Sequence, residues 1–347
     1  MSLGIGIVGA GMISQFCHIA NFVEFPECKV VGLAELRPEL GASACRRFGI
    51  ERYFPDHHAM LADPDIHAVV VVTRRHATGP IVLDALRTGR HVLSEKPMAH
   101  TTAQATRLVE AAEQSGCHYV VGMMKRHCPG VQKARDLVAD LAISGALGPL
   151  LLVQAFCYGG DTAAPRHGFD MTGEIRPDGL TLWPIAPDWL RPGLHQPYAD
   201  FLNVHIHMLN LLRFVLDRSM QVRFADLHQP NGRAIVFDAE GVLVTYGLVE
   251  SQRVPWSEGL DLIFERGKLR LRLPPPMLRD VPATVEIETS HGLECIQVER
   301  DWSFRRQARA FVDDIIADNP PLASGRDALA DMALAEEIWR SSMKEGA

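Results

Sequence analysis

The first third of the chain alternates short apolar runs with segments that have a helical pattern. The apolar runs are rich in Val and Ile and hold few polar residues, which is typical of strands buried on both faces. They cover Gly4–Val8, Val30–Ala34, Ala68–Thr73, His91–Ser94 and Tyr119–Gly122. The helical patterns between them cover Ile13–Val23, Pro38–Phe48, Gly79–Thr88 and Thr102–Gln114. This alternation predicts an α/β domain built on a doubly wound parallel sheet.

The pattern changes after Gly122. Most of the segment from Gln221 to Val298 has the pattern of strands joined by turns, such as Asn231-Gly232. Helices are predicted at Pro129–Ser144, Phe201–Val215, Phe304–Ala317 and Arg326–Ser342, and a further strand at Leu150–Tyr158. A chain of 347 residues is too long for one ordinary core. We therefore expect two domains, 1–122 with the parallel sheet and 123–347 with an α+β fold whose sheet is open and mostly antiparallel.

Composition and charge narrow the class of protein. Hydrophobic residues make up 47% and charged residues 22%, as in soluble globular proteins. The sequence has neither an apolar run of about eighteen residues nor an N-terminal signal pattern, so we expect no membrane span and a cytoplasmic location. A net charge of −7 without a basic block disfavours nucleic acid and favours a small-molecule partner. The seven cysteines include no C-x-x-C pair, which predicts free thiols.

The chain begins with two overlapping glycine patterns. Gly4-x-Gly6-x-x-Gly9 matches G-x-G-x-x-G literally, whereas Gly9-x-Gly11-x-x-Ser14 lacks the third glycine. A loop that binds a dinucleotide follows a strand and opens a helix, so that backbone N–H groups and the helix dipole meet the pyrophosphate. Only the register that begins at Gly9 meets both conditions. It predicts that Gly9 makes the turn and Gly11 admits the pyrophosphate; a glycine-rich turn without a ligand is the alternative.

An acidic residue ends the second predicted strand. Glu35 lies where an acid binds the ribose hydroxyls of adenosine in such folds. A carboxylate there repels a 2′-phosphate, which favours NAD over NADP. Arg37, two residues further on, can offset that repulsion, so NADP stays possible. The alternative is that Glu35 is an ordinary solvated acid at a strand end.

The stretch HVLSEKPMA places Lys96 at the carboxyl end of the fifth predicted strand, which faces the ligand crevice in parallel sheets. With the Gly9 loop and Glu35, this stretch resembles the glucose–fructose oxidoreductase / inositol dehydrogenase family (Gfo/Idh/MocA). The resemblance extends to VVTRRHATGPIVLDALRTGR, GMMKRHCPG and SGRDALADMALAEEIWRS. It implies a Rossmann domain that binds NAD(P) and a second domain that binds substrate. The implied activity is hydride transfer between the nicotinamide and a hydroxyl of a sugar, polyol or related cyclic compound.

The resemblance also implies which residues contact the cofactor. The family's catalytic lysine corresponds to Lys96, which would hydrogen-bond the reacting hydroxyl and take part in proton transfer. Arg74 stands where relatives often have Pro, and Thr78 replaces a common His, so we expect His76 to contact the cofactor instead. The expected cofactor-binding residues are Gly9, Gly11, Met12, Ile13, Glu35, Arg37, Thr73, His76, Glu95 and Lys96.

Relatives commonly carry D-x-x-x-H on a helix of the second domain. In FLNVHIHMLNLL the resemblance puts the catalytic histidine at His207 and Asn203 in place of the acid. Residues four apart share a helix face, so Asn203 could orient the His207 ring, which would accept the hydroxyl proton. Because Asn carries no charge, Lys96 takes more of the proton transfer, another group helps, or catalysis is weak. His205 points about 200° from His207 on a helix; we expect it to pack or line the pocket, and we expect no metal site.

Further substrate contacts are expected beyond the first domain. Lys125-Arg126 matches a basic pair that can face substrate in relatives, with solvated loop charges as the alternative. The long segment Gly159–Ala199 is either a functional lid or an ordered excursion. Its Trp183 suits the apolar face of a sugar ring. Its arginines suit the carboxylate of an acidic sugar, and they are Arg166, Arg176 and Arg191.

Two other functions are compatible with the same fold. An enzyme that uses NAD transiently to cleave a sugar would keep NAD tightly bound and form no net NADH. A regulator would bind the dinucleotide without catalysis, which Asn203 favours and which Lys96 and His207 oppose. Relatives often form dimers or tetramers through the open sheet, so the resemblance also implies a homo-oligomer.

Overall fold

The structure is a computed structural model that describes residues 2–175, 177, 180–229, 232–250 and 256–345. The chain forms two compact units, and each is made of several segments. The first unit comprises Met1–Met123, His167–Asn203 and Phe304–Met332. The second comprises Met124–Arg166, Val204–Ser303 and Ala333–Ala347. The predicted division into 1–122 and 123–347 treated each domain as one continuous stretch, whereas the chain returns to the first unit twice.

The first unit is built on a parallel sheet, as the apolar runs predicted. Its six strands lie in the order β3-β2-β1-β4-β5-β6, and every neighbouring pair is parallel. The strands are β1 (Leu3–Val8), β2 (Cys28–Ala34), β3 (Arg52–Phe54), β4 (Ala68–Val71), β5 (His91–Ser94) and β6 (Tyr119–Val121). The order reverses between β1 and β4, and ligands bind at such a switch point in open α/β sheets.

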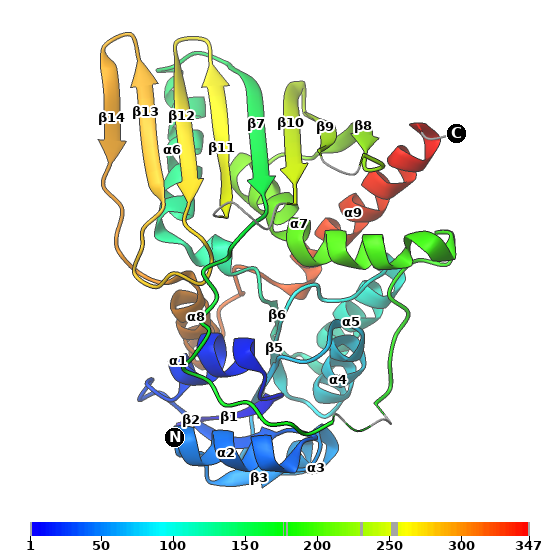
Figure 1. Ribbon diagram of the computed structural model, residues 1–347. Coiled ribbons are helices and arrows are strands. Elements are labelled where there is room, and N and C mark those ends of the chain that lie inside the picture. The colour runs from blue at the N-terminus through cyan, green and yellow to red at the C-terminus, as the bar shows by residue number, and fades with distance from the viewer. Residues whose placement is uncertain (1, 176, 178–179, 230–231, 251–255, 346–347) are drawn as a thin grey trace. The chain divides into compact units, whose positions relative to one another are not determined.

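Helices connect these strands (Figure 1). They are η1 (Ser14–Ile19), α1 (Ala20–Phe22), α2 (Pro38–Phe48), α3 (His57–Leu61), α4 (Arg75–Arg87) and α5 (Thr102–Ser115). The predicted helix Ile13–Val23 is wound as a π-helix over η1, a form that is frequent at functional sites. Strand β3 and helix α3 were not predicted, because segments of three and five residues are too short to show a periodic pattern.

Two C-terminal helices complete the first unit. Helix α8 (Ser303–Ala317) and the start of α9 (Gly325–Glu345) return to it after the last strand of the second unit. The rings of Phe304, at the start of α8, and His18 meet edge to face with their centroids 5.9 Å apart, and Ser324 forms a β-bridge with Val120 of β6. These contacts explain why the first unit is not a single continuous stretch.

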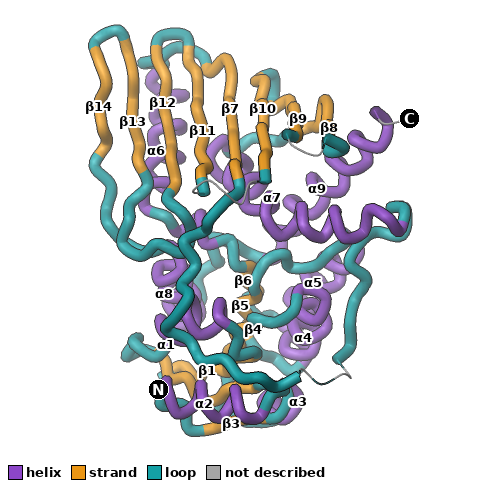
Figure 2. Tube along the Cα trace, viewed as in Figure 1, coloured by secondary structure: helices purple, strands orange, loops and turns teal. Residues whose placement is uncertain are grey.

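The second unit holds the open sheet that was predicted. Its eight strands lie in the order β14-β13-β12-β11-β7-β10-β9-β8 (Figure 2). Only β7 and β10 pair in parallel, and the other neighbours are antiparallel. The strands are β7 (Leu150–Tyr158), β8 (Gln221–Asp226), β9 (Arg233–Ala239), β10 (Val242–Val249), β11 (Ser257–Phe264), β12 (Gly267–Leu273), β13 (Thr284–Thr289) and β14 (Gly292–Ile296). Asn231 of the predicted turn before β9 lies outside the described residues.

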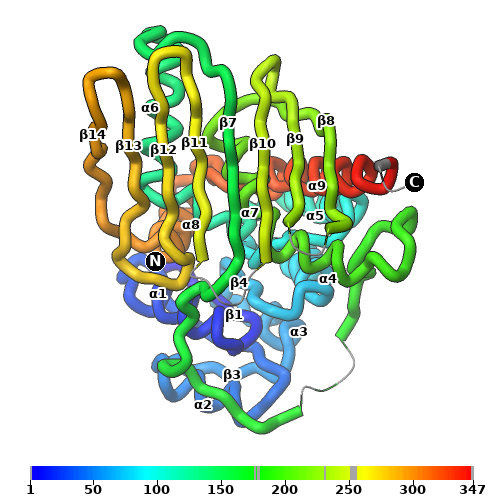
Figure 3. The backbone as a smooth tube through the Cα atoms, turned by 45° about the horizontal axis from the view of Figure 1, so that its top comes forward, coloured from blue at the N-terminus to red at the C-terminus, as the bar shows by residue number. Residues whose placement is uncertain are grey.

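Helices cover one face of this sheet (Figure 3). Helix α6 (Pro129–Ser144) packs against β12 and β13, and α7 (His195–Leu216) contributes its second half, from Val204. Two short 3₁₀ helices, η2 (Met124–His127) and η3 (Pro192–Leu194), precede α6 and α7. Helix α7 begins six residues before the predicted Phe201, since the apolar pattern used to find it starts only there. No helix in the described ranges combines the length and the apolar character needed to cross a membrane.

Candidate active site

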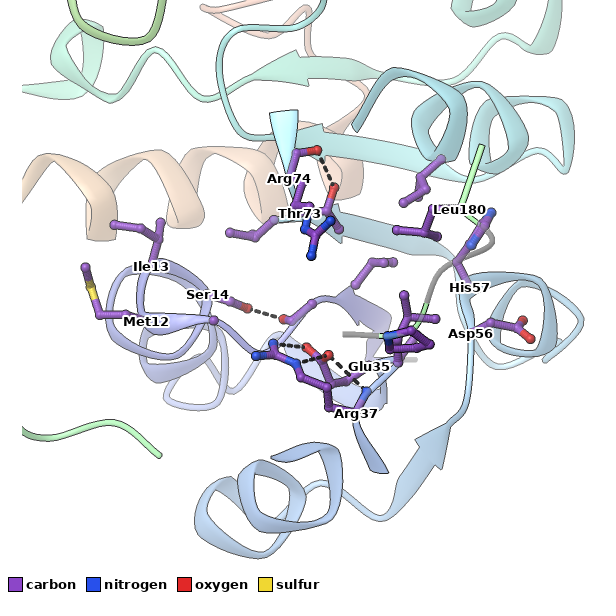
Figure 4. Close-up of a pocket in the computed structure, with 18 residues that line it drawn as sticks. Met12, Ile13, Ser14, Glu35, Arg37, Asp56, His57, Thr73, Arg74 and Leu180 are labelled. Carbon is purple, nitrogen blue, oxygen red and sulfur yellow. Dashed lines mark hydrogen bonds and ion pairs between the residues drawn. The ribbon is translucent and has the colours of Figure 1, made fainter. Parts of the chain in front are cut away.

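A cavity of about 280 Å³ opens where the parallel strands of the first unit end (Figure 4). It lies at the carboxyl ends of β1, β2 and β4, on both sides of the switch point. Most of the predicted cofactor-binding residues line it, namely Gly9, Gly11, Met12, Ile13, Glu35, Arg37 and Thr73. The tertiary structure therefore brings together three segments that the sequence had identified one by one.

The two glycines of the loop differ in what they require. Gly9 has a φ of +95°, and a Cβ there would lie 2.2 Å from the carbonyl oxygen of Val72, so only glycine fits. A Cβ on Gly11 would meet no atom within 4 Å, which leaves an open cradle beside the start of the following helix. The hydroxyl of Ser14 donates to the carbonyl oxygen of Gly9 at 2.5 Å and holds the turn.

The literal glycine motif has a different explanation. Gly4 and Gly6 lie inside β1, as the register argument predicted. A Cβ on Gly4 would come within 1.8 Å of the Asp65 carbonyl oxygen, and one on Gly6 would meet the Met60 side chain at 2.8 Å. These glycines therefore permit close contacts inside the domain, and the loop that borders the cavity begins at Gly9.

Glu35 is held in place by the loop and by its neighbour Arg37. Its Oε2 accepts the Ala10 N–H at 2.8 Å, and its two oxygens accept from Arg37 Nε and Nη2 at 2.8 and 3.0 Å. Burial acts to raise the pKa of Glu35, but the Arg37 and Ala10 hydrogen bonds outweigh it and leave the pKa below its ordinary value. The carboxylate is therefore ionised and aimed at the cavity, where it can accept hydrogen bonds from ribose hydroxyls.

The long segment after β7 supplies part of the cavity wall. Leu180 lines the cavity, and the preceding residues 168–175, which we call the strap, fasten to the first unit. Asp170 accepts from Ser43 Oγ at 2.7 Å and from Arg47 Nη1 at 3.1 Å, and Gln15 exchanges two hydrogen bonds with the Asp170 backbone at 2.8 and 3.0 Å. This part of the segment is an ordered excursion. Arg176, one of its predicted arginines, lies outside the described residues.

Glu174 of the strap occupies the N-terminus of α2. Its carboxylate oxygens accept the backbone N–H groups of Glu39 and Leu40 at 3.0 and 2.9 Å. A carboxylate at this position satisfies orphan donors and complements the helix dipole. Along the chain, Glu174 is 135 residues from Glu39 and 134 residues from Leu40, so no local pattern could have indicated the contact. Asp56 and His57, which also line the cavity, were missed because α3 was not predicted.

Lys96 follows β5 at the same edge of the parallel sheet. Its Nζ donates to the main-chain oxygen of Asn203 at 2.7 Å and to Asn203 Oδ1 at 3.3 Å. Both residues belong to the first unit. The structure thus joins two of the three predicted catalytic residues by direct hydrogen bonds.

Glu95 is positioned by a buried histidine. Its Oε1 lies 2.9 Å from Nε2 of His18, whose side chain is 1% exposed. Burial acts to raise the pKa of Glu95, yet the hydrogen bond from His18 and the charges of His18 and Lys96 leave it below its ordinary value. Glu95 does not line the cavity itself, and its place next to Lys96 indicates a role in holding that loop. No sequence motif singled out His18, which lies in the π-helix.

Trp183 and His76 come together beside the cavity at the switch point. The backbone N–H of Trp183 donates to the His76 carbonyl oxygen at 2.8 Å. Its ring rests on Gly79 of α4, where a Cβ would lie 2.3 Å from the ring. His76 lines a neighbouring cavity rather than the one that holds the glycine loop. The predicted contact between His76 and the cofactor stays a prediction.

The other predicted substrate residues lie in the second unit. Lys125 forms an ion pair with Glu258, and both residues are almost fully buried. Arg126 Nε donates to Asn210 Oδ1 at 2.8 Å, and its guanidinium lies over the Phe214 ring at 4.9 Å. These groups have partners of their own within the unit, which explains their position without a ligand. Their role in substrate binding stays a prediction.

His205 and His207 both lie on α7, as the sequence predicted. His205 is fully buried, and its Nδ1 lies 2.7 Å from the Tyr246 hydroxyl oxygen. Burial lowers the pKa of His205, which therefore packs as a neutral ring. His207 follows Asn203 by one helical turn. Because α7 is helical, the two histidines cannot share a metal ion through one face.

The fold and the cavity define a class of protein with a Rossmann-type dinucleotide-binding domain and a second unit built on an open, mostly antiparallel sheet. The family model GFO_IDH_MocA, described as an oxidoreductase family with an NAD-binding Rossmann fold, matches residues 3–123. An inositol 2-dehydrogenase from Pseudomonas fluorescens is 33% identical over 100% of this chain and 96% of that enzyme. The chain belongs to the Gfo/Idh/MocA oxidoreductase family.

Two further comparisons differ in how much of the chain they cover. A levoglucosan dehydrogenase from Pseudarthrobacter phenanthrenivorans is 30% identical, but the match spans only 43% of this chain and 39% of that enzyme. The solved structure of a 3-ketoreductase from Actinomadura kijaniata, in complex with TDP-benzene and NADP, has a TM-score of 0.76 at 19% identity and 98% coverage of both chains. At that identity the likeness is one of fold.

Proposed function

We propose that this protein is an NAD(P)-dependent oxidoreductase that transfers a hydride between the nicotinamide and a hydroxyl or carbonyl of a sugar, polyol or related cyclic compound. The observation that carries this proposal is the cavity at the switch point, where the open cradle at Gly11 and the ionised Glu35 suit the two ends of an adenosine diphosphate. Inositol and levoglucosan dehydrogenases among the relatives support the substrate class.

Each catalytic residue has a proposed role. A bound nicotinamide supplies the hydride acceptor. Lys96, held by Asn203, donates a hydrogen bond to the reacting oxygen of the substrate. His207 accepts the hydroxyl proton, a role that rests on its match to the family's helix motif. Asn203 holds the Lys96 ammonium through its main-chain oxygen and its Oδ1.

We propose NAD as the preferred cofactor. The guanidinium of Arg37 is already paired with Glu35 through two hydrogen bonds. A 2′-phosphate would have to break that pair and would meet the Glu35 carboxylate. NADP is the alternative cofactor, because the Arg37 side chain could rotate toward a 2′-phosphate. A structural neighbour was also solved with NADP.

We propose a homo-oligomer that forms through the open face of the second sheet. On this face Leu243, Leu152 and Ile263 stand in register across β10, β7 and β11, and Leu243 is 48% exposed. An apolar row of this kind is commonly covered by a partner. The cytoplasmic location expected from the sequence is retained as part of the proposal.

A substrate screen tests the proposed function. Purified protein is incubated with sugars, polyols and sugar acids, and NADH and NADPH formation is followed at saturating cofactor. We expect NADH with at least one substrate and an activity loss of about 10²- to 10⁴-fold in Lys96→Ala. The control is Lys133→Ala, which removes an exposed lysine on α6. Tightly bound NAD with substrate cleavage but no net NADH would support the non-redox alternative, and NAD binding without any turnover would support a regulator.

A further inference from the structure

A second cavity of about 820 Å³ lies in the first unit, at the N-terminal end of α4. Residues of the segment 182–199 form its opposite wall. Thr73 and Arg74 line both this cavity and the one at the switch point, so the two adjoin each other. A molecule bound here would lie next to a cofactor in the first cavity. The volume of the second cavity is in the range of sites for small ligands.

The charged side chains that line this second cavity are the guanidinium groups of Arg74 and Arg75. Among its described residues are two arginines and three histidines, and none is Asp or Glu; the basic residues are Arg74, Arg75, His76, His100 and His195. The carboxylate of Asp200 lies 3.8 Å from Arg75 Nη1, but its side chain is 53% exposed and accepts from Gln196 at 3.0 Å. Because the Asp200 carboxylate is this exposed, it offsets little of the positive charge of Arg75. The cavity therefore favours an anion.

His100 is a buried polar group that faces this cavity. It is 2% exposed and lies in the wall of the cavity. Burial, with the positive charges of Arg75 and His76, lowers the pKa of His100 to about 4. The ring is then neutral near pH 7 and presents one N–H donor and one acceptor. A buried ring in the cavity wall can donate or accept a hydrogen bond with a ligand there.

The apolar wall of the cavity contacts α4 and α5. Trp183 is fixed by its hydrogen bond to His76 and by its contact with Gly79, and the Arg107 guanidinium lies over its ring at 4.9 Å. The next residue, Pro184, accepts a hydrogen bond from Gln104 Nε2 at 3.0 Å. A flat apolar ring next to clustered arginines suits a compact ligand with a carbon skeleton and an anionic group.

We propose that this cavity binds the anionic group of the substrate, so that the substrate is a sugar or polyol carrying a carboxylate or a phosphate ester. Arg75 is the principal anchor, His100 supplies a hydrogen bond, and Trp183 covers the carbon skeleton. The inference rests on the proposed function, because a ligand of this cavity is the substrate only if the adjoining cavity binds the nicotinamide cofactor. It narrows the substrate class beyond the neutral sugars and polyols named for the relatives.

The test compares matched probes on the protein saturated with NAD. D-Glucuronate, D-glucose 6-phosphate and D-glucose are titrated by calorimetry and assayed for NADH formation. We expect one of the two anions to bind at least about tenfold more tightly than glucose. In Arg75→Gln that preference falls roughly 10- to 100-fold, and Arg75→Lys retains part of it. Arg87→Gln, an exposed arginine at the other end of the same helix, leaves the preference unchanged.

The outcomes separate this inference from the proposed function. NADH formation from neutral sugars with equal or weaker binding of both anions would overturn the anionic subsite and leave the oxidoreductase standing. Binding of an anion that Arg75→Gln abolishes, without NADH formation from any probe, would support the subsite and contradict the oxidation. A loss of NAD affinity in Arg75→Gln equal to the loss for the anion would overturn the inference, since the cavity would then serve the cofactor.

Discussion

The ammonium of Lys96 donates to two oxygens of one residue, the main-chain oxygen and Oδ1 of Asn203, at 2.7 and 3.3 Å. An acid is common at this position in the family, and the sequence led us to expect Asn203 to orient His207. In the structure its amide oxygen accepts from Lys96, which the sequence did not indicate, and the orientation of His207 stays a prediction. A neutral partner fixes the position of the ammonium without adding a negative charge beside it.

Replacing Asn203 by Asp should therefore move the pH dependence of the reaction. The new carboxylate would stabilise the protonated form of Lys96, so the limb of the kcat/KM profile that reports loss of this proton should shift to higher pH by about one to two units. Profiles of wild type, Asn203→Asp and Asn203→Ala, measured with saturating NAD, check this. Asn203→Ala removes the side-chain contact without adding a charge; an equal alkaline shift in that variant would rule out the electrostatic explanation.

The pair of Glu35 and Arg37 should control cofactor preference. In Glu35→Ser the carboxylate that repels a 2′-phosphate is gone, and Arg37 loses the acceptor that now holds two of its nitrogens. We expect the ratio of kcat/KM for NADP to that for NAD to rise roughly 10- to 100-fold. Steady-state kinetics with both cofactors measure the ratio.

The double variant Glu35→Ser/Arg37→Ala is the matched control for that change. Without the guanidinium, the gain in NADP use should largely disappear. If the double variant kept the full gain, Arg37 would not be the phosphate ligand and repulsion by Glu35 alone would explain the preference.

Burial of His100 should make the first unit less stable as the pH falls. Its pKa is about 4 in the folded protein and about 6.5 when unfolded, so between these values the unfolded chain binds the extra proton. This histidine alone should lower the free energy of unfolding by about 2 kcal/mol between pH 7 and pH 5. Denaturant unfolding of wild type and His100→Asn at both pH values checks this, and His100→Asn should lose less stability on acidification. An equal loss in both proteins would contradict a depressed pKa.

A charge on the open sheet face should disrupt the proposed oligomer. Leu243 is 48% exposed and aligned with Leu152 of β7. Leu243→Asp places a carboxylate in this apolar row, and we expect a shift to a smaller species by sedimentation velocity. Ile143→Asp changes an exposed side chain on α6 in the same way and should leave the mass unchanged. A monomeric wild-type protein, or an unchanged oligomer in Leu243→Asp, would show that this face is not the interface.

The local elements of the site were predictable from the sequence. Strand β1, the turn at Gly9 and the helix after it lie within about twenty residues, and their apolar periodicity and glycine spacing identify them together. Glu35 and Lys96 were placed in the same way, because each closely follows a strand whose pattern is clear, and the catalytic role expected of Lys96 came from the family resemblance. Parallel strands place their carboxyl ends at one edge, so the gathering of Gly9, Glu35 and Thr73 followed from the fold class.

The tertiary structure alone decided which side chains pair. Glu174 meets the N-terminus of α2 from 135 residues away, and Lys125 meets Glu258 across 133 residues. Such contacts depend on how distant segments return to one core, which no periodic pattern within a short window records. The same limit applies to Asn203, which contacts Lys96 although 107 residues separate the two in the chain. The sequence determined the sheet and the loop through local sterics and hydrophobic periodicity, and the long-range folding of the chain decided the partners of the charged groups around them.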